Sequence, residues 1–246
     1  MTVVGVLHPG EMGAAVGDVL RERGHAVLWA SAGRSAETAE RARELEGVGG
    51  VAELCRRSEI LLSICPPHAA TEVAELARGF SGIYVDANAI APETARTIAG
   101  MHERFVDGGI VGPPPLQPGT TRLYLSGAEA DQVAELFAGT NLDARVIAGS
   151  ASALKAAYAG WTKGSAALLL AVRELARREG VEEALLAEWQ LSIPALEERL
   201  AGAERSAERK GWRWVGEMEE ISLAMADQDL PPGFHEAAAE IFRSWS

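Results

Sequence analysis

The first 148 residues alternate short apolar runs with longer runs in which apolar positions recur at helical spacing. The short runs predict strands at residues 2–7, 25–30, 60–65, 83–87, 105–108, 121–126 and 144–147. The longer runs predict helices at residues 10–23, 35–46, 68–78, 92–102 and 129–137. Because nearly continuous apolar strands are separated by helices, we expect an α/β fold with a mostly parallel sheet covered on both faces.

The strand signals stop after Gly149, and the rest of the chain has the pattern of helices. A long helix is predicted over residues 150–179, with Gly180 placed to cap it. Further helices are predicted at residues 181–190, 193–210, 212–227 and 235–245. We therefore expect two domains, residues 1–148 with the sheet and residues 149–246 as an all-α domain that begins with a long helix.

The composition narrows the classes of partner. The formal net charge of -12 disfavours nucleic acid and anionic membrane surfaces. Cys55 and Cys65 are too few for a disulfide framework, and no Cys/His cluster predicts a metal site. The N-terminus lacks the pattern of a signal peptide, so a cytoplasmic location is expected. Residues 150–172 are nearly uncharged but contain Lys155 and Lys163, which favours a helix buried against protein over a membrane span.

A glycine-containing turn, GVLHPGEMG at residues 5–13, joins the first predicted strand to the first predicted helix. A dinucleotide pyrophosphate binds backbone N–H groups at a helix start where no side chain blocks its approach. Gly10 permits that approach and Gly13 permits close packing, although His8 stands where the usual motif has its first glycine. The turn predicts a Rossmann-type dinucleotide-binding domain, the alternative being an ordinary strand–helix turn. The predicted cofactor contacts here are His8, Pro9, Gly10, Glu11 and Met12.

The end of the second predicted strand distinguishes NAD from NADP. An acidic residue there binds the ribose hydroxyls, whereas an arginine beside small hydroxyl residues suits a 2′-phosphate. This chain has Ser31 and Arg34 at that place and no acidic residue before Glu37. Because a guanidinium offers a forked contact to phosphate, NADP is favoured, with NAD as the other possibility. The alternative for Arg34 is a solvated surface residue.

Lys155 lies one turn into the predicted long helix, among apolar residues. Tyr158 and Thr162 fall on the same side, so the three would form a polar stripe facing a cleft. Burial lowers the pKa of a lysine and lets it exchange a proton near neutrality. Hydride delivery to a carbonyl creates an alkoxide that needs such a proton. The alternative is that Lys155 is solvated, as most lysines on helices are.

Several segments resemble the β-hydroxyacid dehydrogenase superfamily, which includes 6-phosphogluconate and 3-hydroxyisobutyrate dehydrogenases and the imine reductases. The turn GVLHPGEMG is similar to the family's GxIGxGxMG, and Cys65-Pro66 matches its cofactor-side loop. Residues 86–92 (DANAIAP), which include Asn88, resemble the turn D-x-S-T-I-x-P near the nicotinamide. Residues 149–155 (GSASALK) resemble the element G-x-G-x-x-x-K that carries the catalytic lysine. The tail is similar to a subgroup with a short, divergent C-terminal domain.

The resemblance implies an NADP(H)-dependent oxidoreductase that transfers hydride between nicotinamide and a hydroxy or keto substrate. Lys155 would be the general acid/base and Tyr158 a second acid, and residues 149–246 would bind substrate and form a homodimer. Val111 replaces the serine of the family's substrate loop and Tyr158 replaces an asparagine, which argues against a small 2-methyl-3-hydroxy acid as substrate. The candidates for the substrate side are Val111, Gly112, Trp212, Trp214, Glu217 and His235.

Two other functions stay open. Imine reductases use the same cofactor to reduce a C=N bond, but their lysine position is commonly another residue, so Lys155 favours the carbonyl reaction. A non-catalytic NADP-binding sensor or scaffold is the other, because His8 and the substrate loop depart from the family pattern.

Overall fold

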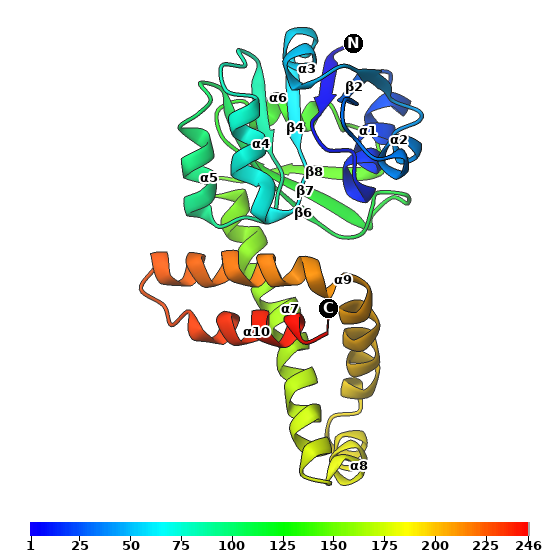
Figure 1. Cartoon of the computed structure of the whole chain (residues 1–246), viewed down its shortest axis with the longest axis vertical. Helices are drawn as coiled ribbons and strands as arrows, with labels where there is room; N and C mark the ends of the chain where they lie inside the picture. Colours follow the sequence, from blue (N-terminus) through cyan, green and yellow to red (C-terminus); the bar gives the residue numbers. More distant parts are fainter. Residues whose placement is uncertain (246) are drawn as a thin grey trace. The chain divides into compact units, whose positions relative to one another are not determined.

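The computed structural model describes residues 1–245, and the chain forms two compact units, Met1–Lys155 and Ala156–Ser246 (Figure 1). The division falls inside the long helix α7 (Ala151–Arg178), whose first turn belongs to the first unit. The functional division predicted at residues 148/149, between a cofactor-binding half and a substrate-binding half, stays a prediction.

The first unit is built on one eight-stranded sheet in the order β3-β2-β1-β4-β5-β6-β7-β8. Its strands are β1 (Val3–Val6), β2 (Ala26–Ala30), β3 (Glu46–Val48), β4 (Ile60–Ser63), β5 (Ile83–Asp86), β6 (Phe105–Val111), β7 (Thr121–Ser126) and β8 (Leu142–Val146). Every neighbouring pair is parallel except β6 and β7, which are antiparallel. The predicted α/β class with a mostly parallel sheet is therefore confirmed.

Both faces of this sheet are covered. The helices of the unit are α1 (Glu11–Glu22), α2 (Ala36–Arg41), α3 (Val51–Arg57), the 3-10 helix η1 (Pro67–Ala69), α4 (Ala70–Leu76), α5 (Pro92–Ala99) and α6 (Ala130–Glu135). Ile83 and Val85 of β5 join the core that contains side chains of α1 and α6, whereas Tyr84 joins the core that contains side chains of α3, α4 and α5. Since successive strand residues point to opposite faces, burial of both faces explains the continuous apolar runs of the sequence.

The second unit is all-α, as predicted. It contains the rest of α7, then α8 (Glu182–Ser192), α9 (Ala195–Asp227) and α10 (Gly233–Arg243). Its core is made by α7, α9 and α10 and includes Leu170, Met218 and Phe242. Across residues 1–245, no helix combines the length and the apolarity that a bilayer crossing requires.

Several predicted elements were wrong in extent. The helix expected over residues 35–46 ends at Arg41, and residues 46–48 instead form the edge strand β3 beside β2. The strand expected to end at Gly108 continues to Val111, because β7 pairs with it along residues 107–111. The helices expected on either side of Gly211 are the single helix α9, since an interior glycine costs only about 1 kcal/mol relative to alanine.

Candidate functional site

Parallel strands bring the predicted cofactor residues to one edge of the sheet. The carboxyl ends of β1, β2, β4, β5 and β6 all lie at that edge, because these strands pair in parallel. Strand β1 lies between β2 and β4, so the chain crosses to opposite sides of β1. A switch of this kind leaves a crevice outside the strand ends, where α/β proteins bind nucleotides.

The turn between β1 and α1 has the geometry of an anion site. A Cβ added to Gly13 would lie 2.3 Å from the backbone oxygen of His8, so only glycine lets α1 start this close to the turn. Gly10 is the N-cap of α1, supplies no side-chain cap, and has nothing within 4 Å of where its Cβ would be. The positive end of the α1 dipole therefore faces an approach that no side chain blocks.

His8 and Arg34 meet above this turn. Nη1 of Arg34 lies 2.7 Å from Nε2 of His8, and Nη2 donates to the backbone oxygen of Leu7 at 3.4 Å. Because a guanidinium only donates, Nε2 accepts and the proton of the neutral ring is assigned to Nδ1. Burial, and then the Arg34 cation, lower the pKa of His8 from 6.5 to about 4.

The same two side chains carry buried polar atoms that have no partner. Nε of Arg34 and Nδ1 of His8 are both enclosed and make no hydrogen bond. A buried donor without an acceptor is costly, and a phosphate oxygen is an acceptor that a guanidinium binds well. These donors and the open start of α1 therefore fit a phosphorylated dinucleotide. Ser31 is arranged differently, because its hydroxyl and its N–H both donate to the carbonyl of Val48 and tie β2 to β3.

A buried network connects the ends of β4 and β5. Asn88 accepts from the N–H of Cys65 at 2.5 Å and donates to Ser63 at 3.0 Å and to Asp86 at 2.8 Å. Pro66 follows as the N-cap of η1. Burial, followed by the nearby Asp86 carboxylate, raises the pKa of the Cys65 thiol to about 12, so it stays protonated. The predicted residues Cys65 and Asn88 are thus in contact, and Asn88 holds the loop after β4 against β5.

The start of α7 is fixed to β6. Asp107 of β6 accepts from the Ser150 hydroxyl at 2.9 Å, the Ser152 hydroxyl at 3.1 Å and the Ser152 N–H at 3.1 Å. A Cβ added to Gly109 would lie 2.8 Å from the Ala151 oxygen and 2.9 Å from Cβ of Lys155. The first turn of α7 thus packs directly on β6, and half-buried Lys155 lies beside the carboxyl-terminal part of that strand.

The predicted substrate residues lie in both units. In the first unit, Val111 is the buried last residue of β6, and exposed Gly112 follows it with φ +125°, a conformation that favours glycine. In the second unit, Tyr158 is 49% exposed, and the Thr162 hydroxyl donates to its carbonyl at 3.0 Å. The Thr162 hydroxyl therefore binds the α7 backbone.

His235 and Trp214 lie inside the second unit. Nε2 of His235 is 3.4 Å from the carbonyl oxygen of Gly160, and the ring is buried. Trp214 packs edge-on against Phe242, with ring centroids 5.0 Å apart. Trp212, by contrast, is exposed. Tyr158, Trp214 and His235 therefore belong to the second unit, whereas the residues at the sheet edge belong to the first.

Two features were missed by sequence reasoning. Asp107 accepts hydrogen bonds at the start of α7, and the two serines just before and at the start of this helix were the available signal. Lys163 makes an ion pair with Glu217 and lies 5.4 Å above the ring of Trp214. No sequence signal joins these residues, because they are far apart along the chain.

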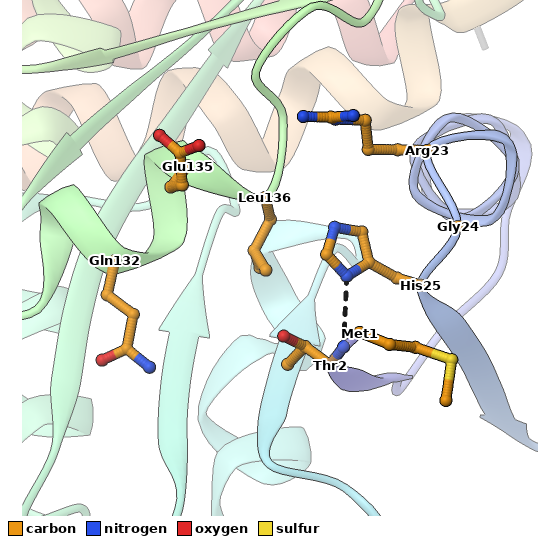
Figure 2. A pocket seen from close by; sticks show the side chains of 8 residues that line it. All are labelled: Met1, Thr2, Arg23, Gly24, His25, Gln132, Glu135 and Leu136. Carbon is orange, nitrogen blue, oxygen red and sulfur yellow. Dashed lines mark hydrogen bonds between the residues drawn. The ribbon is translucent and has the colours of Figure 1, made fainter.

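Figure 2 shows a separate pocket, lined by Met1, Thr2, Arg23, Gly24, His25, Gln132, Glu135 and Leu136. The N–H of Thr2 donates to Nδ1 of His25 at 3.3 Å (Figure 2). Thr2 and His25 precede β1 and β2, so this pocket lies at the amino ends of the strands. It is therefore at the opposite edge of the sheet from the β1–α1 turn and contains none of the predicted site residues.

Two sequence comparisons find proteins without an assigned activity. Residues 176–245 match a family described as a domain of unknown function, DUF1932. A relative from Methanothermus fervidus, the "Uncharacterized 28.5 kDa protein in 7S RNA 5'region", is 32% identical over 163 residues. That match covers 63% of this chain and 63% of the relative, which is less than two thirds of the relative's length.

Solved structures cover nearly the whole chain. A conserved protein of unknown function, described as structurally similar to 3-hydroxyacid dehydrogenases, is 29% identical with a TM-score of 0.73, over 99% of this chain and 96% of that one. The 3-hydroxyisobutyrate dehydrogenase of Mycobacterium tuberculosis is 17% identical with a TM-score of 0.66, over 100% and 94%. A reductive aminase of Aspergillus terreus, solved with NADPH, is 20% identical with a TM-score of 0.61, over 99% and 93%. The chain therefore has the fold of 3-hydroxyacid dehydrogenases and imine reductases over nearly its full length.

Proposed function

We propose that this protein is an NADP(H)-dependent oxidoreductase that acts between a hydroxyl and a carbonyl group, with Lys155 as the general acid/base. The observation that supports it most is the gathering of three features at one sheet edge: an open helix start, Arg34 with an unsatisfied buried donor, and Lys155. All three belong to the first unit, so the argument depends on that unit alone.

The turn and the strand ends would bind the cofactor. The start of α1 at Gly10 would receive the pyrophosphate, and Arg34 would receive the 2′-phosphate. The Asn88 network would hold the loops after β4 and β5 beside the nicotinamide end. The bound cofactor supplies the hydride in reduction and accepts it in oxidation.

Lys155 would manage the proton. In reduction its ammonium donates a proton to the oxygen of the carbonyl as that oxygen becomes an alkoxide, and in oxidation the neutral amine takes a proton from the hydroxyl. Packing of α7 on β6 and the Asp107 cap fix the backbone from which Lys155 extends. Tyr158 stays a second candidate acid, and Val111, Gly112, Trp214 and His235 stay candidates for the substrate side.

The first experiment is a titration of the folded protein with NADPH and NADH, followed through its tryptophan fluorescence. NADPH oxidation is then measured with keto acids, aldehydes and cyclic imines. We expect Lys155→Ala to lower turnover of the carbonyl substrates by at least about 100-fold with unchanged NADPH affinity, as loss of a general acid does. Lys210→Ala, on α9, is the matched control and should keep wild-type turnover.

The other outcomes of these measurements would each favour a different function or refute the proposal. Unchanged turnover in Lys155→Ala would remove the proposed role of this lysine. Turnover of cyclic imines alone would favour the imine reductase alternative. Binding of NADPH with no turnover of any substrate class would favour the sensor or scaffold, and no binding of either dinucleotide would refute the proposal.

A further inference from the structure

His8 occupies the place where the resembling turn GxIGxGxMG has a glycine, and its side chain makes a contact that glycine cannot make. The imidazole of His8, in the turn after β1, contacts Arg34, which lies in the loop after the neighbouring strand β2. Arg34 therefore binds two acceptors of the β1 turn, Nε2 of His8 and the backbone oxygen of Leu7.

These contacts restrict a side chain that is otherwise flexible. An arginine loses rotamer entropy when it is fixed, and a ligand that orders it must supply that free energy. In this protein His8 and Leu7 already order the guanidinium before a ligand arrives. The cost of ordering is then met by folding and does not weaken binding.

The contacts also leave part of the guanidinium available. Nη1 and Nη2 are directed to the turn, whereas the buried Nε makes no hydrogen bond. The ring of His8 must stay neutral to accept from Arg34, and its lowered pKa shows that its surroundings keep it so near neutral pH. Because Arg34 as a whole is only half-buried, its positive charge stays accessible beside the end of β2.

We propose that His8 is a positioning residue that holds Arg34 for the 2′-phosphate of NADPH and thereby sets the preference of this protein for the phosphorylated dinucleotide. This inference rests on the proposed function, because it assumes that the turn binds a dinucleotide. The inference goes beyond the proposed function because it assigns the selectivity for phosphate to His8, a residue that replaces a glycine of the motif and acts through the side chain of Arg34.

The test compares dissociation constants for NADPH, NADH and the fragment 2′,5′-ADP, measured by tryptophan fluorescence and calorimetry without any turnover. We expect His8→Gly to weaken NADPH and 2′,5′-ADP by about tenfold, as loss of one charge-assisted contact does, and to leave NADH nearly unchanged. Glycine is the residue of the motif, so this variant should fold. His8→Gln, whose amide oxygen can accept in place of Nε2, should restore most of the NADPH affinity.

A double-variant cycle shows whether His8 acts through Arg34. Arg34→Ala alone should weaken NADPH and spare NADH, and adding His8→Gly to Arg34→Ala should change NADPH affinity no further. Equal weakening of NADPH and NADH by His8→Gly, or the same tenfold loss in the Arg34→Ala background, would overturn the inference while leaving dinucleotide binding intact. A wild-type protein that binds neither dinucleotide would overturn the proposed function and this inference together.

Discussion

The imidazole of His8 connects the chemistry of the turn to the stability of the fold. Its pKa is lowered from 6.5 to about 4, first by burial and then by the Arg34 cation. Between these two values the unfolded chain binds a proton at this site more readily than the folded protein does. The stability that depends on neutral His8 is therefore fully present above about pH 6.5 and is lost as the pH falls towards about 4.

A variant that cannot titrate at this position should escape that loss. Between about pH 7 and about pH 4.5 we expect His8→Gln to lose less unfolding free energy than the wild type, by about 1–2 kcal/mol, because the ring is only partly buried. Urea titrations at both pH values measure the difference. His68→Gln removes an exposed histidine from η1 and should follow the wild type; parallel profiles for His8→Gln and wild type would show that His8 is not held neutral by the fold.

At the scale of elements, one strand–helix contact positions the candidate acid. Gly109 of β6 lies so close to α7 that a Cβ would overlap the Ala151 oxygen and Cβ of Lys155. Asp107, on the same strand, accepts hydrogen bonds from Ser150 and Ser152 at the start of this helix. Strand β6 therefore fixes the position of the first turn of α7, and with it the distance between the Lys155 backbone and the strand.

A substitution that moves α7 away from β6 but keeps Lys155 tests whether the position of the helix matters for turnover. We expect Gly109→Ala to destabilise the protein by about 1–3 kcal/mol, since overpacking forces a backbone shift, and to lower turnover with little change in NADPH affinity. Gly149→Ala, just before α7 with nothing within 4 Å of its Cβ position, is the matched control and should change neither quantity. A Gly109→Ala protein with wild-type stability would contradict the close contact.

At the scale of the whole molecule, α7 carries an exposed apolar stripe. Trp161, Leu168 and Leu175 are 72%, 50% and 60% exposed and recur at intervals of seven residues, which places them on one face of the helix. Large apolar side chains exposed along one face of a helix are candidates for an interaction surface. The stripe supports the expected homodimer, which stays a prediction.

If α7 pairs with a second copy, a charge in the middle of the stripe should separate the copies. We expect the wild type to elute at the mass of a dimer in size-exclusion chromatography with light scattering, and Leu168→Glu at that of a monomer, because a carboxylate is costly to bury. Leu76→Glu changes an equally exposed leucine on α4 and should leave the dimer intact. A monomeric wild type, or a Leu168→Glu dimer, would exclude this stripe as the interface.

Local pattern alone predicted much of this protein. Most of the order of strands and helices, the glycine turn before α1 and the long helix α7 follow from periodicity and from residues that cap or break helices, which act between near neighbours in the chain. The helix α3 (Val51–Arg57) was not predicted. The residues at the carboxyl ends of the strands could also be named, because their place follows from strand order. The short strand β3 could not, since its pairing with β2 depends on residues distant in sequence.

The tertiary structure decided the contacts between distant residues. It brought Arg34 onto His8, joined Cys65 to Asn88, and set Asp107 and Gly109 against the start of α7. It also placed His235 against Gly160, in the core of the second unit, where the sequence had suggested only a substrate-side candidate. A sequence records which side chains are available, but hydrogen bonds and steric fit depend on distances of a few ångströms that only packing of the whole unit defines.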